Sequence, residues 1–172
     1  TLRRSWADDP LRFVVAGLGM GHIRAKEIVE TSGVALLGVC DIDEERAIRT
    51  AKACDAPYQT DIQPYLDDPE VEVVMVMNET GRHADLSCQA LEAGKHVLVT
   101  KPMEMAVAAC DRMMTAAERN ERVLAVDFCR RLRPSTQTLS AAVSDGFFGR
   151  HHPIAAGDGH RHWLGYQHVL TS

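Results

Sequence analysis

The sequence lacks long apolar runs, and it is poor in aromatic residues and in positive charge. Aromatic residues make up 5% of its 172 residues, and 19 Lys and Arg are outnumbered by 24 Asp and Glu, which gives a net charge of −5. A net negative charge disfavours binding to nucleic-acid phosphates, so we expect no nucleic-acid partner. The longest apolar runs, Val34–Cys40 and Val71–Met77, are far shorter than the roughly 18–20 residues of a membrane helix, so we expect no membrane partner.

Closely spaced cysteine pairs and an apolar leader are also absent from the sequence. The five cysteines are odd in number and widely separated, which is typical of reduced thiols in a cytoplasmic protein. No apolar segment follows the arginines of Thr1–Trp6, so this segment is not expected to be a signal peptide. We therefore predict a cytoplasmic protein. Because the sequence does not begin with Met, we expect a trimmed or partial chain.

Short apolar runs alternate with helical patterns along most of the sequence. Strands that are apolar on both faces and separated by helices are typical of a parallel sheet covered on both sides. Right-handed crossovers then predict an α/β fold with a doubly wound parallel sheet, the Rossmann type. The expected strands are Leu11–Ala16, Val34–Cys40, Val71–Met77, His96–Val99 and Val123–Val126, and the expected helices are His22–Thr31, Asp43–Ala53, Ala84–Ala93, Ala106–Asn120 and Thr136–Val143.

The composition changes after Gly149, where five of the eight histidines fall in the last 22 residues. We predict an N-terminal extension at 1–10, a dinucleotide-binding domain at 11–149, and only the beginning of a second α/β domain at 150–172. A zinc site is the alternative for the histidine-rich segment, but structural zinc sites often use cysteines, and these are distant in the sequence. We therefore predict no metal site. The candidate ligands in that alternative are His151, His152, Asp158, His160 and His162.

A glycine-rich turn follows the first expected strand directly before a helix. In the G-x-G-x-x-G fingerprint, the first glycine makes the turn, the second admits a pyrophosphate and the third allows close helix–strand packing. Here His22 occupies the third position and Gly21 precedes it, so the match is partial, and a simple strand–helix turn is the alternative. The candidate cofactor-binding residues of this turn are Gly17, Leu18, Gly19, Met20, Gly21 and His22.

An acidic residue closes the second expected strand. Asp41 follows Gly21 by 20 residues, near the position where the Rossmann fold places an acid on the adenosine ribose. Its carboxylate would repel a 2′-phosphate, so NAD is favoured, while the nearby Arg46 leaves NADP open. Ile42 belongs to the same segment. The alternative is that Asp41 and Asp43 only begin the next helix.

A lysine follows another buried strand. Ligands of open α/β sheets bind beyond the carboxyl ends of the strands, so Thr100 and Lys101 are expected near the cofactor. Lys101 could then hydrogen-bond a substrate hydroxyl or carbonyl. A solvated surface lysine is the alternative.

Taken together, these motifs resemble the glucose–fructose oxidoreductase / inositol dehydrogenase (Gfo/Idh/MocA) family. The resemblance covers about residues 11–150. It rests on the glycine turn, Asp41, the segment from Asn78 to His83, the A-L-x-A-G-K-H-V block from Ala90 to Val97 with Lys101-Pro102 after it, and the segment from Phe128 to Pro134.

The resemblance implies roles for individual residues. It places Asn78, Glu79 and His83 beside the ribose and nicotinamide side of the cofactor, and Arg131 near its carboxamide end. It makes Lys101 the catalytic residue, in contact with the nicotinamide ribose and the substrate. This sequence departs from the family pattern at Asn78-Glu79, which replace Thr-Pro, at Thr100, which replaces Glu, and at His22, which replaces the third glycine.

These observations predict an NAD(P)-dependent oxidoreductase that transfers a hydride between nicotinamide and a secondary alcohol of a sugar, cyclitol or polyol. The alternative is a non-catalytic dinucleotide-binding regulator with the same fold. The expected partners are NAD, or NADP, and a small sugar or polyol substrate, and the full-length protein is expected to be a homo-oligomer. We expect the 172-residue chain by itself to lack dehydrogenase activity.

Overall fold

A parallel sheet of six strands, in the order β3-β2-β1-β4-β5-β6, organises the computed structural model, which describes residues 9–149. The chain runs from the central β1 outward to β2 and β3, then crosses over to β4 and continues outward to β5 and β6. This confirms the predicted doubly wound α/β fold. The strands are β1 (Leu11–Ala16), β2 (Val34–Cys40), β3 (Tyr58–Gln59), β4 (Val73–Val76), β5 (His96–Thr100) and β6 (Leu124–Asp127).

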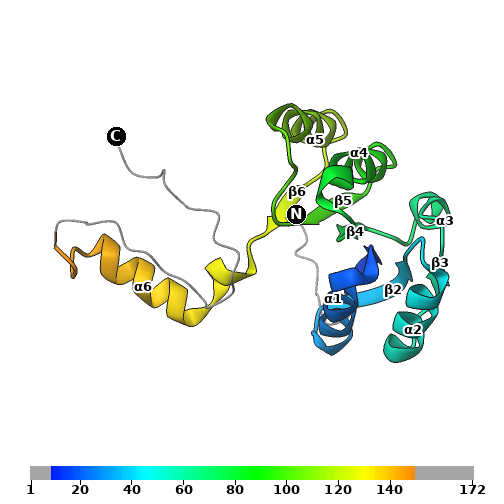
Figure 1. Ribbon diagram of the computed structural model, residues 1–172, viewed down its shortest axis with the longest axis horizontal. Helices are drawn as coiled ribbons and strands as arrows, with labels where there is room; N and C mark the ends of the chain where they lie inside the picture. The colour runs from blue at the N-terminus through cyan, green and yellow to red at the C-terminus, as the bar shows by residue number, and fades with distance from the viewer. Residues whose placement is uncertain (1–8, 150–172) are drawn as a thin grey trace. The chain divides into compact units, whose positions relative to one another are not determined.

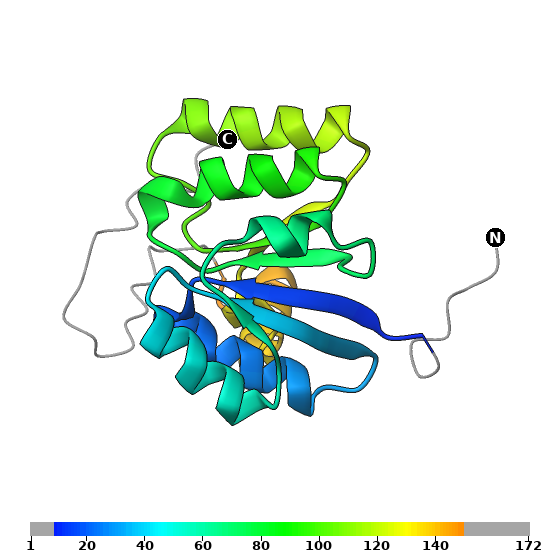
Figure 2. The same ribbon diagram turned by 90° about the vertical axis from the view of Figure 1, so that its right-hand side faces the viewer.

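Helices cover both faces of the sheet. Figure 2 shows α1 and α2 below the strands and α4 and α5 above them, and Figure 1 labels the same elements. The helices of this part of the chain are α1 (Leu18–Glu30), α2 (Glu44–Cys54), α3 (Gln63–Asp67), the single turn η1 (Thr80–Arg82), α4 (His83–Glu92) and α5 (Val107–Arg119). None of the helices described between residues 9 and 149 is long and apolar enough to cross a membrane.

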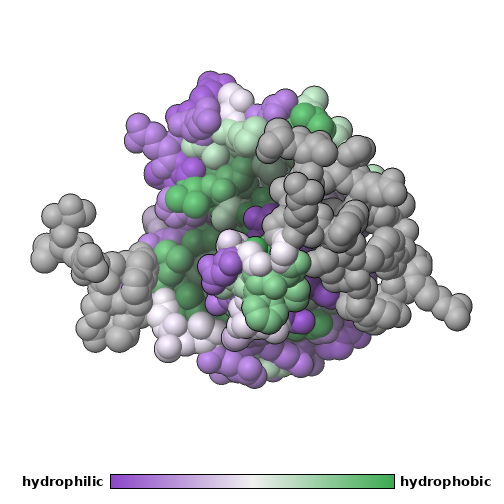
Figure 3. All heavy atoms as spheres, turned by 90° about the vertical axis from the view of Figure 1, so that its left-hand side faces the viewer, coloured by the Kyte–Doolittle hydropathy of each residue, from purple (hydrophilic) through white to green (hydrophobic). Residues whose placement is uncertain are grey.

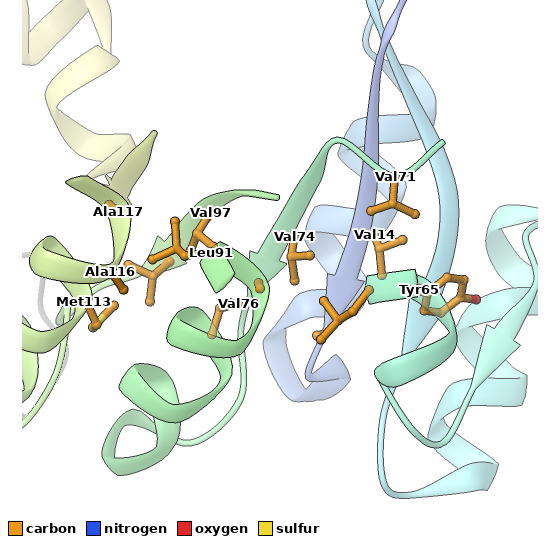
Figure 4. Close-up of a cluster of buried hydrophobic side chains, with 14 of the residues drawn as sticks. Val14, Tyr65, Val71, Val74, Val76, Leu91, Val97, Met113, Ala116 and Ala117 are labelled. Atoms are coloured by element: carbon orange, nitrogen blue, oxygen red, sulfur yellow. The ribbon is translucent and has the colours of Figure 1, made fainter. Parts of the chain in front are cut away.

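Two apolar clusters lie on opposite faces of the sheet because successive strand residues point to opposite sides. Val14 packs in the cluster under α3, α4 and α5, whereas its neighbour Val15 packs in the cluster against α1 and α2. Figure 4 shows the first of these clusters, in which strand valines meet Leu91 of α4 and Met113 of α5. Full burial of such side chains contributes about 1.5–3 kcal/mol each, so the sheet is held mainly by apolar packing on both faces.

The short elements after α2 were not predicted. β3 pairs with β2, and α3 buries Tyr65 and Leu66. The ring of Tyr65 lies against Gly38 of β2, where a Cβ would come within 2.7 Å of its Cε1. Gly38 is therefore required for close packing, a role that glycine often has inside strands.

The start of the first helix was predicted wrongly. Residues 18–21 were assigned to the turn before a helix at His22, but α1 begins at Leu18. Gly17 alone makes the turn, because its φ of 91° reverses the chain within one residue. The other predicted strands and long helices agree with the observed elements to within two residues at either end.

The chain divides into two compact units between Phe128 and Cys129. The sheet and its helices belong to the first, and the described part of the second contains η2 (Cys129–Leu132) and α6 (Pro134–Ser144). The predicted domain limits at residues 10 and 149 stay predictions. The histidine-rich segment 150–172, with the candidate zinc ligands, lies outside the described residues.

Candidate functional site

A cavity of about 600 Å³ lies at the carboxyl ends of β1, β2 and β4. This is the edge of the sheet where open α/β proteins bind their ligands. The lining comes from the segments that follow these strands, from the β3–α3 connection and from the start of α4. The lining residues are Ala16, Gly17, Gly19, Cys40, Asp41, Ile42, Asp43, Arg46, Thr60, Asp61, Ile62, Met77, Asn78, Glu79, Arg82, Asp85, Leu86 and Gln89.

Gly17 brings two strands together at the floor of the cavity. A Cβ at this position would lie 2.6 Å from the Cα of Asn78 and 2.6 Å from the carbonyl carbon of Met77. The backbone N–H of Met77 donates to the carbonyl of Ala16 (2.7 Å), and that of Gly17 donates to Cys40 (2.8 Å). Only glycine fits both the positive φ and this close approach.

Gly19 and Gly21 have different surroundings. A Cβ at Gly19 would meet nothing within 4 Å, and Gly19 lines the cavity. A Cβ at Gly21 would lie 3.1 Å from Val15 Cγ1 and 3.2 Å from Met77 Cβ. Gly21 therefore permits the close packing of α1 on the sheet that the fingerprint assigns to its third glycine, one residue earlier than the usual spacing.

The amino end of α1 presents backbone donors at the cavity. The first N–H groups of a helix have no partners within it, and Gly17, the N-cap residue of α1, forms no side-chain cap bond. The first turn of α1 contains no acidic residue. The helix dipole and these N–H donors can therefore bind an anionic group such as a phosphate.

Asp41 is buried, and its carboxylate accepts four hydrogen bonds from three residues. Its Oδ2 accepts a 2.6 Å hydrogen bond from the backbone N–H of Leu18, and its Oδ1 accepts one of 2.9 Å from that of Asp43. The guanidinium of Arg46 donates from Nη1 to both oxygens, at 3.2 Å to Oδ2 and at 3.4 Å to Oδ1. These hydrogen bonds fill the roughly four acceptor positions of a carboxylate, so a ligand hydroxyl would have to share an oxygen of Asp41 with Arg46 or take the place of Arg46.

Asp43, and not Asp41, begins α2. The side chain of Asp43 accepts the N–H of Arg46 (3.0 Å) as the N-cap of the helix, and it also forms an ion pair with the Arg46 guanidinium.

Cys40 also lines the cavity, and its thiol pKa is raised to about 12 by burial and by the charges of Asp61 and Asp41. Cys40 is therefore a neutral lining group at ordinary pH.

Asn78 presents an unpartnered acceptor beside the cavity. Its Nδ2 donates to the carbonyl of Arg82 (3.3 Å), whereas its Oδ1 is buried and has no hydrogen-bond partner among the described residues. A buried polar atom is normally hydrogen-bonded, so Oδ1 is a candidate acceptor for a ligand donor. Glu79, the next residue, also lines the cavity and is exposed.

Lys101 lies at the carboxyl end of β5, on the same edge of the sheet as the cavity but outside its lining. It is exposed and is joined to Pro102 by a cis peptide bond. Thr100 is the last residue of β5 and is half-buried. Both residues stand where the sequence placed them in the fold, and their contact with a cofactor stays a prediction.

The structure thus separates the predicted cofactor residues into groups. Seven line the cavity: Gly17, Gly19, Asp41, Ile42, Arg46, Asn78 and Glu79. Leu18 and Gly21 are buried in the helix–sheet contact, Met20 is exposed, and the ring of His22 contacts the carbonyl of Gly19 (2.7 Å) within α1. His83 is fully buried, and Arg131 belongs to η2 in the second unit.

Sequence reasoning missed the part of the lining that comes from the β3–α3 connection and from α4. Thr60, Asp61 and Ile62 follow a two-residue strand that left no periodic pattern, and Asp85 and Gln89 recur at helical spacing on α4. No group of histidine, cysteine and acidic residues in the described part of the chain could hold a metal ion.

Comparison with known proteins identifies the fold. Residues 11–128 match the model of an oxidoreductase family with an NAD-binding Rossmann fold, Gfo/Idh/MocA. An inositol 2-dehydrogenase of Salmonella typhimurium is 31% identical over 145 residues, which are 81% of this chain and 43% of that protein. A D-glucoside 3-dehydrogenase of Escherichia coli is 30% identical over 151 residues, which are 86% of this chain and 43% of that dehydrogenase.

A solved structure shows the same fold. The myo-inositol 2-dehydrogenase of Lactobacillus plantarum superposes with a TM-score of 0.76 over 82% of this chain and 43% of its own, at 23% identity. The chain therefore spans less than half the length of the relatives that it matches.

Proposed function

The chain belongs to the Gfo/Idh/MocA family of oxidoreductases and has its NAD-binding Rossmann fold, and on that premise we propose that it forms the cofactor-binding part of an NAD-dependent dehydrogenase. The proposed reaction transfers a hydride between nicotinamide and a secondary alcohol of a sugar, cyclitol or polyol. Relatives named inositol and glucoside dehydrogenases support this substrate class.

The observation that carries the proposal is the convergence of three features on one cavity. Gly19 and Asn78 line this cavity, the amino end of α1 lies beside it, and the buried Oδ1 of Asn78 has no hydrogen-bond partner among the described residues. NAD, when bound, supplies the hydride acceptor. The amino end of α1 would hold its pyrophosphate, and Asp41 would accept from the adenosine ribose hydroxyls.

A preference for NAD over NADP is part of the proposal. The cavity lining contains five carboxylates, Asp41, Asp43, Asp61, Glu79 and Asp85, and two guanidinium groups, Arg46 and Arg82. Arg46 is already paired with Asp41 and Asp43, so a 2′-phosphate would have to compete with these carboxylates for it. We therefore expect NADP to bind, but more weakly than NAD.

Lys101 is the proposed acid–base residue. Its exposed side chain at the end of β5 would hydrogen-bond the reacting substrate hydroxyl and move its proton, a role worth about 10²–10⁴-fold in rate. Thr100 and Arg131 have their proposed cofactor roles from the family pattern alone. The rival function, a dinucleotide-binding regulator without turnover, is favoured by Thr100 in place of the family's Glu and is opposed by the retained Lys101-Pro102.

Two experiments test the proposal. Calorimetric titration of the chain with NAD and NADP tests the site, and equal or tighter binding of NADP would contradict the role of Asp41. In the full-length protein, a polyol screen that follows the absorbance of reduced nicotinamide tests turnover. Lys101→Ala should keep the NAD affinity within a few-fold but reduce turnover by about 10²-fold or more. Turnover that survives this change would exclude Lys101 as the acid–base residue, and NAD binding without any turnover would favour the regulator.

A further inference from the structure

His83 is the first residue of α4 and has no exposed surface. The residues around it belong to two segments that leave the same edge of the sheet. One follows β4 and carries Asn78, and the other follows β5 and carries Lys101, Pro102 and Met103. A buried histidine between two such segments is in a position to connect them.

Both ring nitrogens of His83 face backbone carbonyls. Nε2 lies 3.0 Å from the carbonyl oxygen of Asn78, and Nδ1 lies 3.1 Å from that of Pro102 and 3.3 Å from that of Met103. A carbonyl oxygen only accepts, so the ring donates in each bond that it makes. Each ring nitrogen that carries a proton therefore donates to the segment that it faces.

Glu104 connects the same two segments a second time. Its Oε2 accepts the backbone N–H of Ala84 (2.9 Å), at the start of α4, and its Oε1 accepts that of Met105 (2.7 Å). Desolvation opposes ionisation of Glu104, but these two N–H groups and the nearby His83 lower the pKa of its carboxyl. The charged carboxylate therefore supports the connection that His83 makes.

The residues at either end of this connection belong to the proposed site. Asn78, whose carbonyl His83 binds, lines the cavity and holds its own side chain against Arg82. Lys101 directly precedes Pro102, whose carbonyl His83 also binds. The backbone on which Lys101 stands is thus fixed relative to the cavity wall through one imidazole ring.

We propose that His83 is a positioning residue that sets Lys101 relative to the cofactor cavity by binding the β4 and β5 segments together. In this proposal His83, which has no exposed surface, acts through the backbone of the two segments. The proposal rests on the proposed function, since Lys101 has a defined position to keep only if it acts on a substrate beside NAD. Misplacement of a reacting group by about 1 Å can cost about 10²-fold in rate.

Conservative variants separate the two connections. The amide nitrogen of His83→Gln can replace Nε2 and keep the bond to Asn78, whereas that of His83→Asn can replace Nδ1 and keep the bond to Pro102. The matched control is His96→Asn, which changes a half-buried histidine at the opposite end of β5. Hydrogen exchange of residues 101–106 and 78–82 is measured in the chain, together with NAD affinity by calorimetry. The constants kcat and KM are measured in the full-length protein.

For His83→Gln we expect exchange in residues 101–106 to become about tenfold faster, the effect of losing roughly one buried hydrogen bond. NAD affinity should stay within threefold, and kcat should fall about 10- to 100-fold without a matching rise in KM for NAD. For His83→Asn we expect hydrogen exchange to become faster in residues 78–82 instead, and NAD affinity to become several-fold weaker. The control His96→Asn should change neither the hydrogen exchange of these two segments nor the NAD affinity.

Unchanged hydrogen exchange in residues 101–106 of His83→Gln would overturn the proposal. Equal losses of NAD affinity and kcat in both His83 variants, fully accounted for by the fraction of unfolded protein, would overturn it as well. The exchange measurement requires neither NAD nor a substrate. A protein without turnover would therefore disprove the dehydrogenase function, while the exchange result would still decide whether His83 binds the two segments together.

Discussion

The carboxylate of Asp41 lies 2.6 Å from the backbone N–H of Leu18, so the acid at the end of β2 is bonded to the first residue of α1. The acid that is proposed to bind the ribose therefore also satisfies one of the free donors at the start of the helix. Its effects on folding and on cofactor binding should be separable by the choice of variant.

Replacing Asp41 should affect both stability and cofactor choice. Asp41→Ala leaves the buried N–H of Leu18 without an acceptor, which should cost about 1–3 kcal/mol of unfolding free energy. The variant should also bind NAD more weakly, with a smaller loss for NADP, because the proposed ribose acceptor is removed together with its repulsion of a 2′-phosphate. Urea unfolding and calorimetry with both cofactors measure the two effects.

Asp43→Ala is the control for this variant. It removes the N-cap of α2 at a cost of about 0.5–2 kcal/mol but keeps the carboxylate of Asp41. A shift toward NADP as large as that of Asp41→Ala would show that the preference depends on the general negative charge of the cavity and not on Asp41.

The two glycines at the start of α1 should respond oppositely to the same change. Gly21→Ala places a methyl group 3.1 Å from Val15 Cγ1, and overpacking of this kind costs about 1–3 kcal/mol. Gly19→Ala meets open space and should stabilise the helix by up to about 1 kcal/mol, yet weaken NAD binding because its methyl group points at the proposed ligand. Thermal unfolding and calorimetry of both variants test this, and an unaffected NAD affinity in Gly19→Ala would place the pyrophosphate elsewhere.

The strands and long helices could be predicted from the sequence because their apolar periodicity reflects burial on one or both faces of the sheet. Asp41 and the glycines could be located for the same reason, since they directly follow strands with a clear pattern. β3 and α3 could not be predicted, because two and five residues are too few to show a period, and Gly38 has meaning only once Tyr65 is packed on it.

The assignment of His83 shows what sequence cannot reveal about a site. A family pattern places this residue near the cofactor, but only the fold shows that Pro102 and Met103, about 20 positions away, supply the carbonyls for its ring. Buried side chains that bind distant backbone atoms leave no local pattern. The same holds for Asp41 and Leu18, which are 23 positions apart.

Thiol reactivity should follow burial and charge. Cys129 is exposed, whereas Cys40 is buried and its thiol pKa is raised to about 12. Because the thiolate is the reactive form, alkylation of the native chain at pH 7.5 should modify Cys129 first and leave Cys40 unmodified until the chain unfolds. Mass spectrometry of timed samples measures the order, with a urea-unfolded sample as the control, and labelling of Cys40 as fast as that of Cys129 would contradict the burial of the cavity floor.

Stability should fall on mild acidification because of His96. Burial and the neighbouring charge of Arg122 lower the pKa of His96 from its ordinary value of 6.5, against the opposing effect of Glu72. In the folded chain its unprotonated Nδ1 accepts a 3.0 Å hydrogen bond from the N–H of Val123. Well above pH 6.5 the ring is neutral in both states and this contribution is fully present.

As the pH falls below 6.5, the unfolded chain takes up a proton that the folded chain excludes, so the contribution of His96 is lost progressively until the lower folded pKa is passed. His96→Asn keeps an acceptor near Nδ1 but does not titrate, so its unfolding free energy should fall less between pH 7.5 and 5.5, by a difference of about 0.5–1 kcal/mol, the net worth of one hydrogen bond. Urea unfolding of both proteins at several pH values in this range measures the difference, and because other histidines titrate in both, only the difference reports on His96. Parallel pH profiles would show that His96 titrates alike in the folded and unfolded chains, which would contradict this prediction.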